Sequence, residues 1–394
     1  GVDEPRCGRS LTGMQRRPII AGVEKGWNAL DVQEKACWLA LFGASEVDRA
    51  AAKRVVYRLA VAEHTPLSVC AGRSAEDLAQ LLPELSAEQL EAWERALAHR
   101  EPSEQMLSDL SSQGMDVLTR ADIAYPENLA ERLPEPWLPY VLYYRGNVDL
   151  MARPCVSVAG TATPNDDAAQ LVRTLAEVLS PLPLVLAGGY SQGVDRLMLT
   201  ESAARAGGTM VMLPFGFAHA APILRAGDQA VSKGERLELS PYAPETPFSP
   251  ALGTARTRLV TALADALVFV DPDGQAEDWP GYSDLTAHGG LALIHAPSQA
   301  SRTAAQGSPA IIAFTNSIEA LQRISQHLVL EEDEPGVEEI AVAADTDESP
   351  DQVYRFADAA SAIARLEETG HVPEKLIRRL REAEKRGTLS TDNE

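Results

Sequence analysis

The chain has 394 residues, of which 45% are hydrophobic and 23% charged, and its 57 acidic against 35 basic side chains give a net charge of −22. This length exceeds one ordinary domain and the apolar content excludes a wholly disordered chain, so we expect two or three globular parts. The charge excludes non-specific binding of a polyanion by the protein as a whole, because such binding needs concentrated Lys and Arg. Any site for a nucleic acid must therefore be local.

The cysteines and the apolar runs indicate the compartment. The four cysteines are far apart, without a CxxC pair or a His at ligand spacing, at Cys7, Cys37, Cys70 and Cys155. This pattern predicts neither a metal site nor a disulfide framework and is typical of a reducing cytoplasm. No apolar run approaches the roughly 18 residues that a membrane helix needs. We therefore expect a cytoplasmic protein that makes no membrane contact.

The first part of the chain is predicted to be helical. Residues 1–30 show no sustained periodicity and are expected to form a flexible arm. Apolar residues at helical spacing follow over residues 31–112, and Ser74 and Ser86 stand where N-caps are expected. We predict a small helical domain over 31–112 with no catalytic constellation.

Short apolar runs alternate with longer segments after Gly114 and predict an α/β domain over residues 113–328. The predicted strands are Met115–Leu118, Val141–Tyr144, Cys155–Ala159, Leu184–Ala187, Thr209–Leu213, Arg236–Leu239, Ala266–Val270, Leu291–His295 and Ala310–Phe314. Their continuous apolar character indicates parallel strands buried on both faces, with crossover helices between them. We therefore expect an α/β fold with a doubly wound parallel sheet.

The C-terminal part differs in composition. Glu331–Asp351 contains ten acidic and no basic residues, which is typical of a solvated linker, and we place this acidic linker at 329–352. Beyond it, residues 353–394 hold two amphipathic patterns, Tyr354–Leu366 and the Arg-rich Pro373–Arg386. They are expected to form a small helical region.

Ligands of doubly wound sheets bind at the carboxyl ends of strands where the strand order reverses, so the loops there are candidate sites. The first loop, residues 160–166, reads Gly-Thr-Ala-Thr-Pro-Asn-Asp, with Thr163 as the expected N-cap of the next helix. Free N–H groups at a helix start beside a Gly turn bind anions. Asp166 and Asp167 weaken this interpretation, because they already satisfy the positive end of the helix dipole.

The second loop, residues 188–195, reads Gly-Gly-Tyr-Ser-Gln-Gly-Val-Asp and is the most informative stretch of the chain. Its glycines permit positive φ and close approach of a ligand, Ser191 and Gln192 offer hydrogen bonds, and Tyr190 is suited to stack on a base. The alternative is that the glycines only make a tight turn. Their spacing is not the GxGxxG dinucleotide fingerprint.

Two arginines, Arg256 and Arg258, form the third candidate. Two residues apart on a helix they cannot share a face, so one is expected to face the ligand and the other the sheet edge or an acidic partner. Arg recognises phosphate through two parallel hydrogen bonds. A structural salt bridge is the competing interpretation.

Catalytic motifs are missing from the sequence. The chain has no GxSxG, no Walker GxxxxGK[ST] and no HxxxH pair. We expect a protein that is not an enzyme and that carries no cofactor and no metal.

An ordered series of motifs runs through about residues 115–297. It comprises Asp122…Tyr125-Pro126…Leu129, Pro139…Gly146-Asn147, Gly160, Gly188…Gly193-Val194-Asp195, Gly207-Gly208-Thr209, Leu239-Ser240 and Arg256-Thr257-Arg258-Leu259-Val260. In this order the motifs resemble those of the DNA-processing protein A (DprA/Smf) family. The resemblance implies an extended Rossmann-like fold of the SLOG superfamily, a helical domain before it, binding of single-stranded DNA, and dimerisation through the Rossmann-like domain.

The chain departs from the family pattern at the expected binding loops. Ala162 stands where the family has the Arg of a G-S-R turn, and Thr257 stands for the Asn of its R-N-R motif. Leu199 and Pro241 replace a His and a Glu. Polar groups are therefore missing where the family is understood to hold DNA.

The resemblance leads us to expect a non-catalytic protein that binds single-stranded DNA or a nucleotide and acts in DNA processing, recombination or defence against foreign DNA. We expect a homodimer, with a recombinase or a toxin-like protein as partner. The predicted binding residues are Gly160, Thr161, Thr163, Gly188, Gly189, Tyr190, Ser191, Gln192, Gly193, Asp195, Arg256 and Arg258.

Two other functions are weighed against this one. The missing polar groups and the acidic surface favour a nucleotide-sensing regulatory or antitoxin-like module that holds a partner protein, for example in an anti-phage system. A nucleotide phosphoribohydrolase of the same superfamily is the third interpretation. Its P-G-G-x-G-T-x-x-E loop has no match in this chain.

Overall fold

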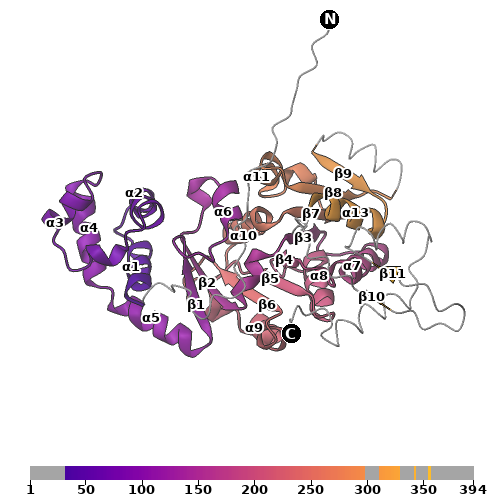
Figure 1. Cartoon of the computed structure of the whole chain (residues 1–394), viewed down its shortest axis with the longest axis horizontal. Helices are drawn as coiled ribbons and strands as arrows, with labels where there is room; N and C mark the ends of the chain where they lie inside the picture. The colour runs from indigo at the N-terminus through magenta and orange to yellow at the C-terminus, as the bar shows by residue number, and fades with distance from the viewer. Residues whose placement is uncertain (1–31, 298–309, 329–340, 343–353, 356–394) are drawn as a thin grey trace, which may run out of the picture.

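The computed structural model describes residues 32–297, 310–328, 341–342 and 354–355 (Figure 1). The predicted arm at 1–30 lies outside these ranges. The helices before the sheet gather at one end of the molecule (Figure 1) and are α1 (Val32–Gly43), α2 (Arg49–Val56), α3 (Ala75–Leu81), α4 (Ala87–Ala98) and α5 (Glu101–Ser112). The Ser74 hydroxyl accepts a hydrogen bond from Asp77 N, and Ser86 forms a capping box with Gln89. Both predicted helix starts are therefore confirmed.

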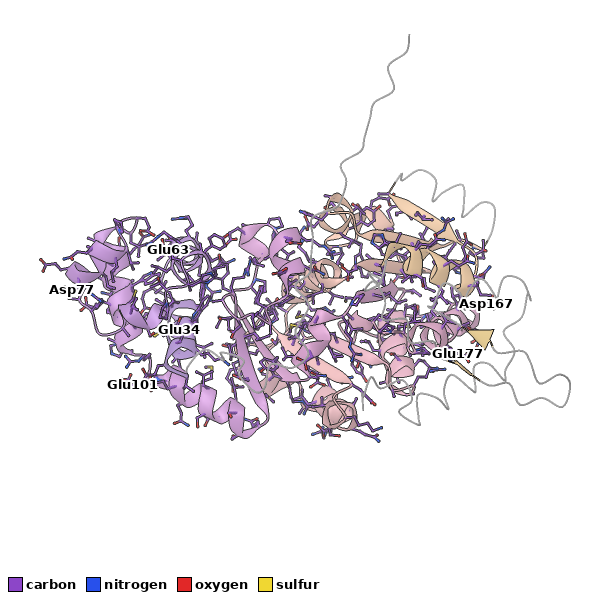
Figure 2. The ribbon with its side chains drawn as sticks, viewed as in Figure 1. Glu34, Glu63, Asp77, Glu101, Asp167 and Glu177 are labelled. Carbon is purple, nitrogen blue, oxygen red and sulfur yellow. The ribbon has the colours of Figure 1, made fainter. Side chains whose placement is uncertain are left out.

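A buried carboxylate organises this helical part. Glu34 on α1 accepts hydrogen bonds from Trp38 Nε1 at 2.9 Å and from the backbone N–H groups of Leu67 and Ser68, both at 2.8 Å. Figure 2 shows Glu34 amid the helices, whereas Asp77 and Glu101 lie toward the outside. Three donors compensate the desolvation of the Glu34 charge, so the residue ties α1 to the turn that follows α2.

The sheet has nine strands in the order β1-β2-β6-β5-β4-β3-β7-β8-β9. They are β1 (Met115–Thr119), β2 (Val141–Gly146), β3 (Cys155–Gly160), β4 (Val185–Gly188), β5 (Gly208–Met212), β6 (Arg236–Ser240), β7 (Ala266–Val270), β8 (Leu291–His295) and β9 (Ile311–Phe314). All nine predicted strands are present, and β3 to β9 pair parallel with one another.

The predicted doubly wound parallel sheet has an antiparallel edge. β1 pairs antiparallel with β2, and β2 pairs antiparallel with β6. Apolar periodicity predicts that a strand exists but carries no information on its direction. The α/β fold class is confirmed, with a mixed sheet that is parallel from β6 to β9.

Helices cover both faces of the sheet, as expected for a doubly wound fold. On one face lie α7 (Asp166–Leu179), α8 (Val194–Ala203), α9 (Ala221–Ser232) and α13 (Ser317–His327), and on the other α10 (Pro250–Leu263) and α11 (Tyr282–Ala287). The chain proceeds from β3 to β6 on one side of β3 and from β7 to β9 on the other. The strand order therefore reverses between β3 and β7, where a ligand site is expected.

The helical part and the sheet are joined by charged and aromatic contacts. Lys35 Nζ on α1 lies 2.8 Å from Asp116 Oδ1 on β1. Lys53 Nζ on α2 donates to the carbonyl oxygen of Leu138 at 2.8 Å, and the Phe42 and Tyr140 rings lie 5.3 Å apart. These contacts fix α1 and α2 against the antiparallel edge of the sheet.

The end of the chain differs from the prediction where it is described. Ala341–Val342 (β10) pairs antiparallel with Tyr354–Arg355 (β11). Tyr354–Arg355 is thus a strand and not the start of the predicted helix, and β10 interrupts the predicted linker, because periodicity fixes helix boundaries only to within a few residues. The other residues of the linker and of the two predicted helices lie outside the described ranges. Across the part of the chain that the structure covers, no helix combines the length and apolarity needed to cross a membrane.

Candidate functional site

The loop between β4 and α8 is held by the carboxylate of Asp195. Its oxygens accept hydrogen bonds from Gly189 N at 3.1 Å and from Ser191 N at 2.7 Å. Tyr190 between them has φ +57°, a left-handed conformation that is uncommon for a residue with a side chain. Burial raises the pKa of the Asp195 carboxyl, while these N–H donors and the charge of Arg256 oppose the increase. A Cβ on Gly188 would overlap Asp195 Oδ1, so the glycine is needed there.

Arg256 on α10 approaches this loop from the opposite side. It is only 8% exposed, and its Nη2 donates to Ser191 Oγ at 2.7 Å. The Ser191 side chain also lowers the pKa of the Asp195 carboxyl, so it acts on both charged groups. Arg256 Nε is buried and has no hydrogen-bond partner among the described residues. The site therefore contains a buried, unpaired cationic donor, an arrangement that is costly unless an acceptor reaches it.

Gly189 leaves the space that the Arg256 guanidinium occupies. A Cβ on Gly189 would overlap the guanidinium. Burial lowers the pKa of Arg256, and the Asp195 charge opposes this shift. The second glycine of the predicted loop thus serves the arginine of the third candidate rather than the approach of a ligand to the backbone.

Two further arginines, Arg196 and Arg236, lie against Tyr190. Their Cζ atoms are 5.1 Å and 5.5 Å from the centre of its ring, within the range of cation–π contact. Arg196 also donates from Nη2 to the Tyr190 carbonyl at 3.3 Å. Stacking of a base on Tyr190, as predicted, therefore requires the exposed Arg196 to change position.

The loop after β3 differs in detail from its prediction. The N-cap of α7 is Asn165, whose side chain accepts from Ala168 N, and not Thr163. Thr163 N donates to Thr161 Oγ1 at 3.1 Å instead, which places it in a side-chain turn before the helix. Asn is at least as strong an N-cap as Thr, which explains the later start.

Gly160 and Gly193 allow the two loops to touch. Gly193 has φ +90°, and a Cβ there would overlap the Thr161 carbonyl and Ala162. Val194 N donates to the same Thr161 carbonyl at 3.1 Å. A Cβ on Gly160 would overlap the Val270 carbonyl. Both glycines are thus needed for close backbone contacts at the ends of β3 and of the β4 loop, and the role of Gly193 is compatible with the alternative interpretation of a tight turn.

The two predicted arginines, Arg256 and Arg258, face different parts of the molecule, as their spacing on one helix predicts. Arg256 faces the β4 loop, whereas Arg258 Cζ lies 4.6 Å from the ring centre of Trp137 and its Nε 3.5 Å from Asp284 Oδ2. The structure thus brings together Tyr190, Ser191, Asp195 and Arg256, leaves Gln192 exposed at the loop tip, and places Arg258 elsewhere. The sequence prediction missed Arg196 and Arg236. Arg196 directly follows the Gly-rich loop and could have been included, whereas Arg236 was assigned to a buried strand.

Removal of the Asp195 carboxylate tests whether it holds the loop. Asp195→Ala leaves two backbone N–H groups without their acceptor and is expected to lower the free energy of unfolding by about 1–3 kcal/mol. Asp195→Asn keeps an acceptor oxygen and should lose less. Urea denaturation measures both, with the exposed Asp278→Ala as the control. Equal losses in Asp195→Ala and in the control would contradict this role.

Comparison with known proteins finds a family resemblance over part of the chain. The pattern of the family described as DNA recombination-mediator protein A matches residues 116–277. Over these residues, which are less than half of its length, the chain resembles this family as a divergent relative. The match contains all three candidate loops, and it confirms the resemblance inferred from the order of the motifs.

Individual relatives are distant. DNA processing protein DprA of Streptococcus pneumoniae (strain ATCC BAA-255 / R6) is 27% identical over 151 residues, which are 38% of this chain and 52% of the relative. The chain thus spans about half the length of this curated relative.

Three solved structures illustrate how similar the chain is to proteins of known structure. The X-ray structure of S. pneumoniae DprA has a TM-score of 0.45 and 17% identity, covering 63% of this chain and 90% of that one. The structure of Helicobacter pylori DNA processing protein A, described by its single-stranded DNA binding mode, has a TM-score of 0.44 and 18% identity, with coverage of 54% and 96%. The molybdenum cofactor carrier protein of Chlamydomonas reinhardtii has a TM-score of 0.31 and 17% identity, with coverage of 45% and 99%.

Proposed function

We propose that the chain binds single-stranded DNA at the carboxyl edge of its sheet, through Arg256 and the loop from Gly188 to Asp195, and that it acts in DNA processing. The family match over residues 116–277 supports the ligand class, because the matching family is described as a DNA recombination mediator and the curated relative as a DNA processing protein. The protein binds and does not catalyse in this proposal.

One observation carries the proposal: the unpaired Nε of Arg256, a residue that is more than nine-tenths buried. Arg256 is also the first arginine of the Arg-Thr-Arg-Leu-Val stretch that resembles the family's motif. A phosphate oxygen supplies the charged acceptor that this donor lacks, once the atoms that cover Nε move aside to admit it. The exposed Arg196, at the other side of Tyr190, offers a second cation to a neighbouring phosphate.

The salt dependence of oligonucleotide binding tests the proposal. Each phosphate neutralised on a single strand contributes a slope of about −0.7 to the plot of log affinity against log salt. A site with two or three cationic side chains therefore predicts a slope between about −1.4 and −2.1. Fluorescence anisotropy with labelled oligo-dT measures it. No binding at low salt would remove DNA as the ligand.

A nucleotide-sensing module that holds a partner protein is the second candidate. The net charge of −22 favours it, because a long polyanion is repelled by most of this surface whereas a mononucleotide meets only the local site. Binding of a nucleoside monophosphate with an affinity equal to that of a long oligo-dT would select this function. The homodimer and the recombinase or toxin-like partner remain predictions.

A further inference from the structure

We propose that Asp273 excludes phosphate from the loop after β3 and thereby confines the ligand to the β4 side of the site. The consequence for DNA binding rests on the proposed function, whereas the contacts of Asp273 do not depend on that function. Asp273 is exposed and follows β7, the strand that pairs with β3 at the point where the strand order reverses. Doubly wound folds place an anionic ligand at this point.

Three backbone amides of the β3 loop, those of residues 161–163, donate to acceptors within the protein. Thr161 N donates to the Asp271 carbonyl at 3.0 Å, and Ala162 N donates to Asp273 Oδ2 at 3.3 Å. Thr163 N donates to Thr161 Oγ1. Of the three acceptors, only Asp273 supplies a negatively charged oxygen. Its carboxylate therefore stands in the position that an anionic ligand oxygen takes when a glycine turn binds phosphate.

The backbone around Asp271 places Asp273 over the loop. Asp271 has φ +49°, a left-handed conformation at the residue directly after β7. The last residue pair between β3 and β7 is Gly160 and Val270. One residue further, the Asp271 carbonyl accepts a hydrogen bond from Thr161 N, which holds the segment after β7 against the β3 loop. This turn brings the next acidic side chain, two residues later, to Ala162 N. A left-handed residue with a side chain persists only where its surroundings fix it, which is consistent with a defined position for Asp273.

The charge of Asp273 acts on any phosphate that approaches. A phosphate at the β3 loop would find the Ala162 N–H already bonded to Asp273. The negative charge of the Asp273 carboxylate would also repel the phosphate. On the β4 side, by contrast, Arg256 and Arg196 present cations. A strand of DNA is therefore expected to bind with its phosphates along the β4 loop and α10 and to avoid the β3 loop.

Replacement of Asp273 tests the exclusion directly. In Asp273→Ala the Ala162 amide loses its acceptor and becomes available to an anion. Titration with inorganic phosphate, followed at the Ala162 amide by NMR, is expected to shift this signal in the variant and leave it unchanged in the wild type. Because Asp273 is exposed, the variant is expected to fold as the wild type does. An Ala162 signal that is equally insensitive in both proteins would overturn the inference.

Oligonucleotide affinity links the inference to function. Asp273→Ala should bind oligo-dT about two- to fivefold more tightly, as expected for the gain of an anion contact at exposed backbone N–H groups. Asp273→Asn should gain less, because its amide oxygen still accepts from Ala162 N. Asp278→Ala removes the same charge from an exposed residue of the same segment and should change the affinity little. An equal gain in Asp278→Ala would overturn the inference in favour of net charge. If the wild type and every variant fail to bind oligo-dT at low salt, the proposed function fails, and the phosphate titration alone decides on Asp273.

Discussion

Arg256→Ala is expected to weaken the binding of oligo-dT at least about tenfold, whereas Arg258→Ala should change it less than about twofold. Hydrogen bonds to charged groups are worth about 1.5–3 kcal/mol, which corresponds to a tenfold or larger change in affinity. Arg256 is beside the β4 loop with an unpaired Nε, while Arg258 is engaged by Trp137 and Asp284. The two arginines lie two residues apart on one helix, so they make a matched pair. Fluorescence anisotropy titrations at one low salt concentration measure both.

Controls separate binding from folding for Arg256. Because the guanidinium is buried against Gly189, its removal leaves a cavity. The Asp195 carboxylate also loses the positive charge that compensates its own. Arg256→Lys retains the charge but loses the planar donor group, so it should fold more nearly as the wild type does and still bind DNA weakly. Circular dichroism and thermal melting establish that each variant is folded. Wild-type affinity in a folded Arg256→Ala would remove this residue from the site.

The fold was predictable where burial leaves a simple pattern. Strands such as Ala266–Val270 and Leu291–His295 match their predicted bounds, because fully buried parallel strands read as uninterrupted apolar runs. The antiparallel edge was not predictable, since the sequence of Met115–Thr119 carries no signal for strand direction. Its direction depends on pairing with Val141–Gly146, a tertiary contact without a local signal.

The candidate site was predictable in its position but not in its chemistry. The Gly-rich stretch after β4 and the separation of Arg256 from Arg258 were both evident from the sequence. The sequence did not indicate that Asp195 and Asp273 would occupy the N–H groups of the two loops. Glycines that permit close approach to the backbone permit it equally to a carboxylate of the same chain. Whether a ligand or a carboxylate of the chain binds the N–H groups of such a turn depends on residues that are far apart in sequence. Ala162 and Asp273, which are joined by a hydrogen bond, are an example.

The buried ions beneath Tyr190 connect the site to the stability of the sheet. Glu238 on β6 is fully buried, and its two carboxylate oxygens lie 2.8 Å from the Nε atoms of Arg236 and Arg145. Arg145 is on β2, opposite Glu238 in the antiparallel pairing, so the carboxylate holds the β2–β6 junction. A Cβ on Gly227 of α9 would overlap Glu238 and Arg236, so the helix lies close over this group. Arg236 in turn supports the Tyr190 ring.

Glu238→Ala is therefore expected to lower the free energy of unfolding by about 3–5 kcal/mol, because it leaves the buried Arg236 guanidinium without its counter-ion and Arg145 with the exposed Asp228 alone. Arg236 is 3% exposed, and its Nη2 has no hydrogen-bond partner among the described residues. Glu238 is the carboxylate that pairs with Arg236 in this group, and the variant removes it. Urea denaturation followed by circular dichroism measures the loss. Asp228→Ala is the matched control, since Asp228 also pairs with Arg145, at 2.9 Å, but its side chain is 63% exposed. Its removal should cost at most about 1 kcal/mol. Similar losses in the two variants would mean that the β2–β6 junction is held by its backbone pairing and not by the buried carboxylate.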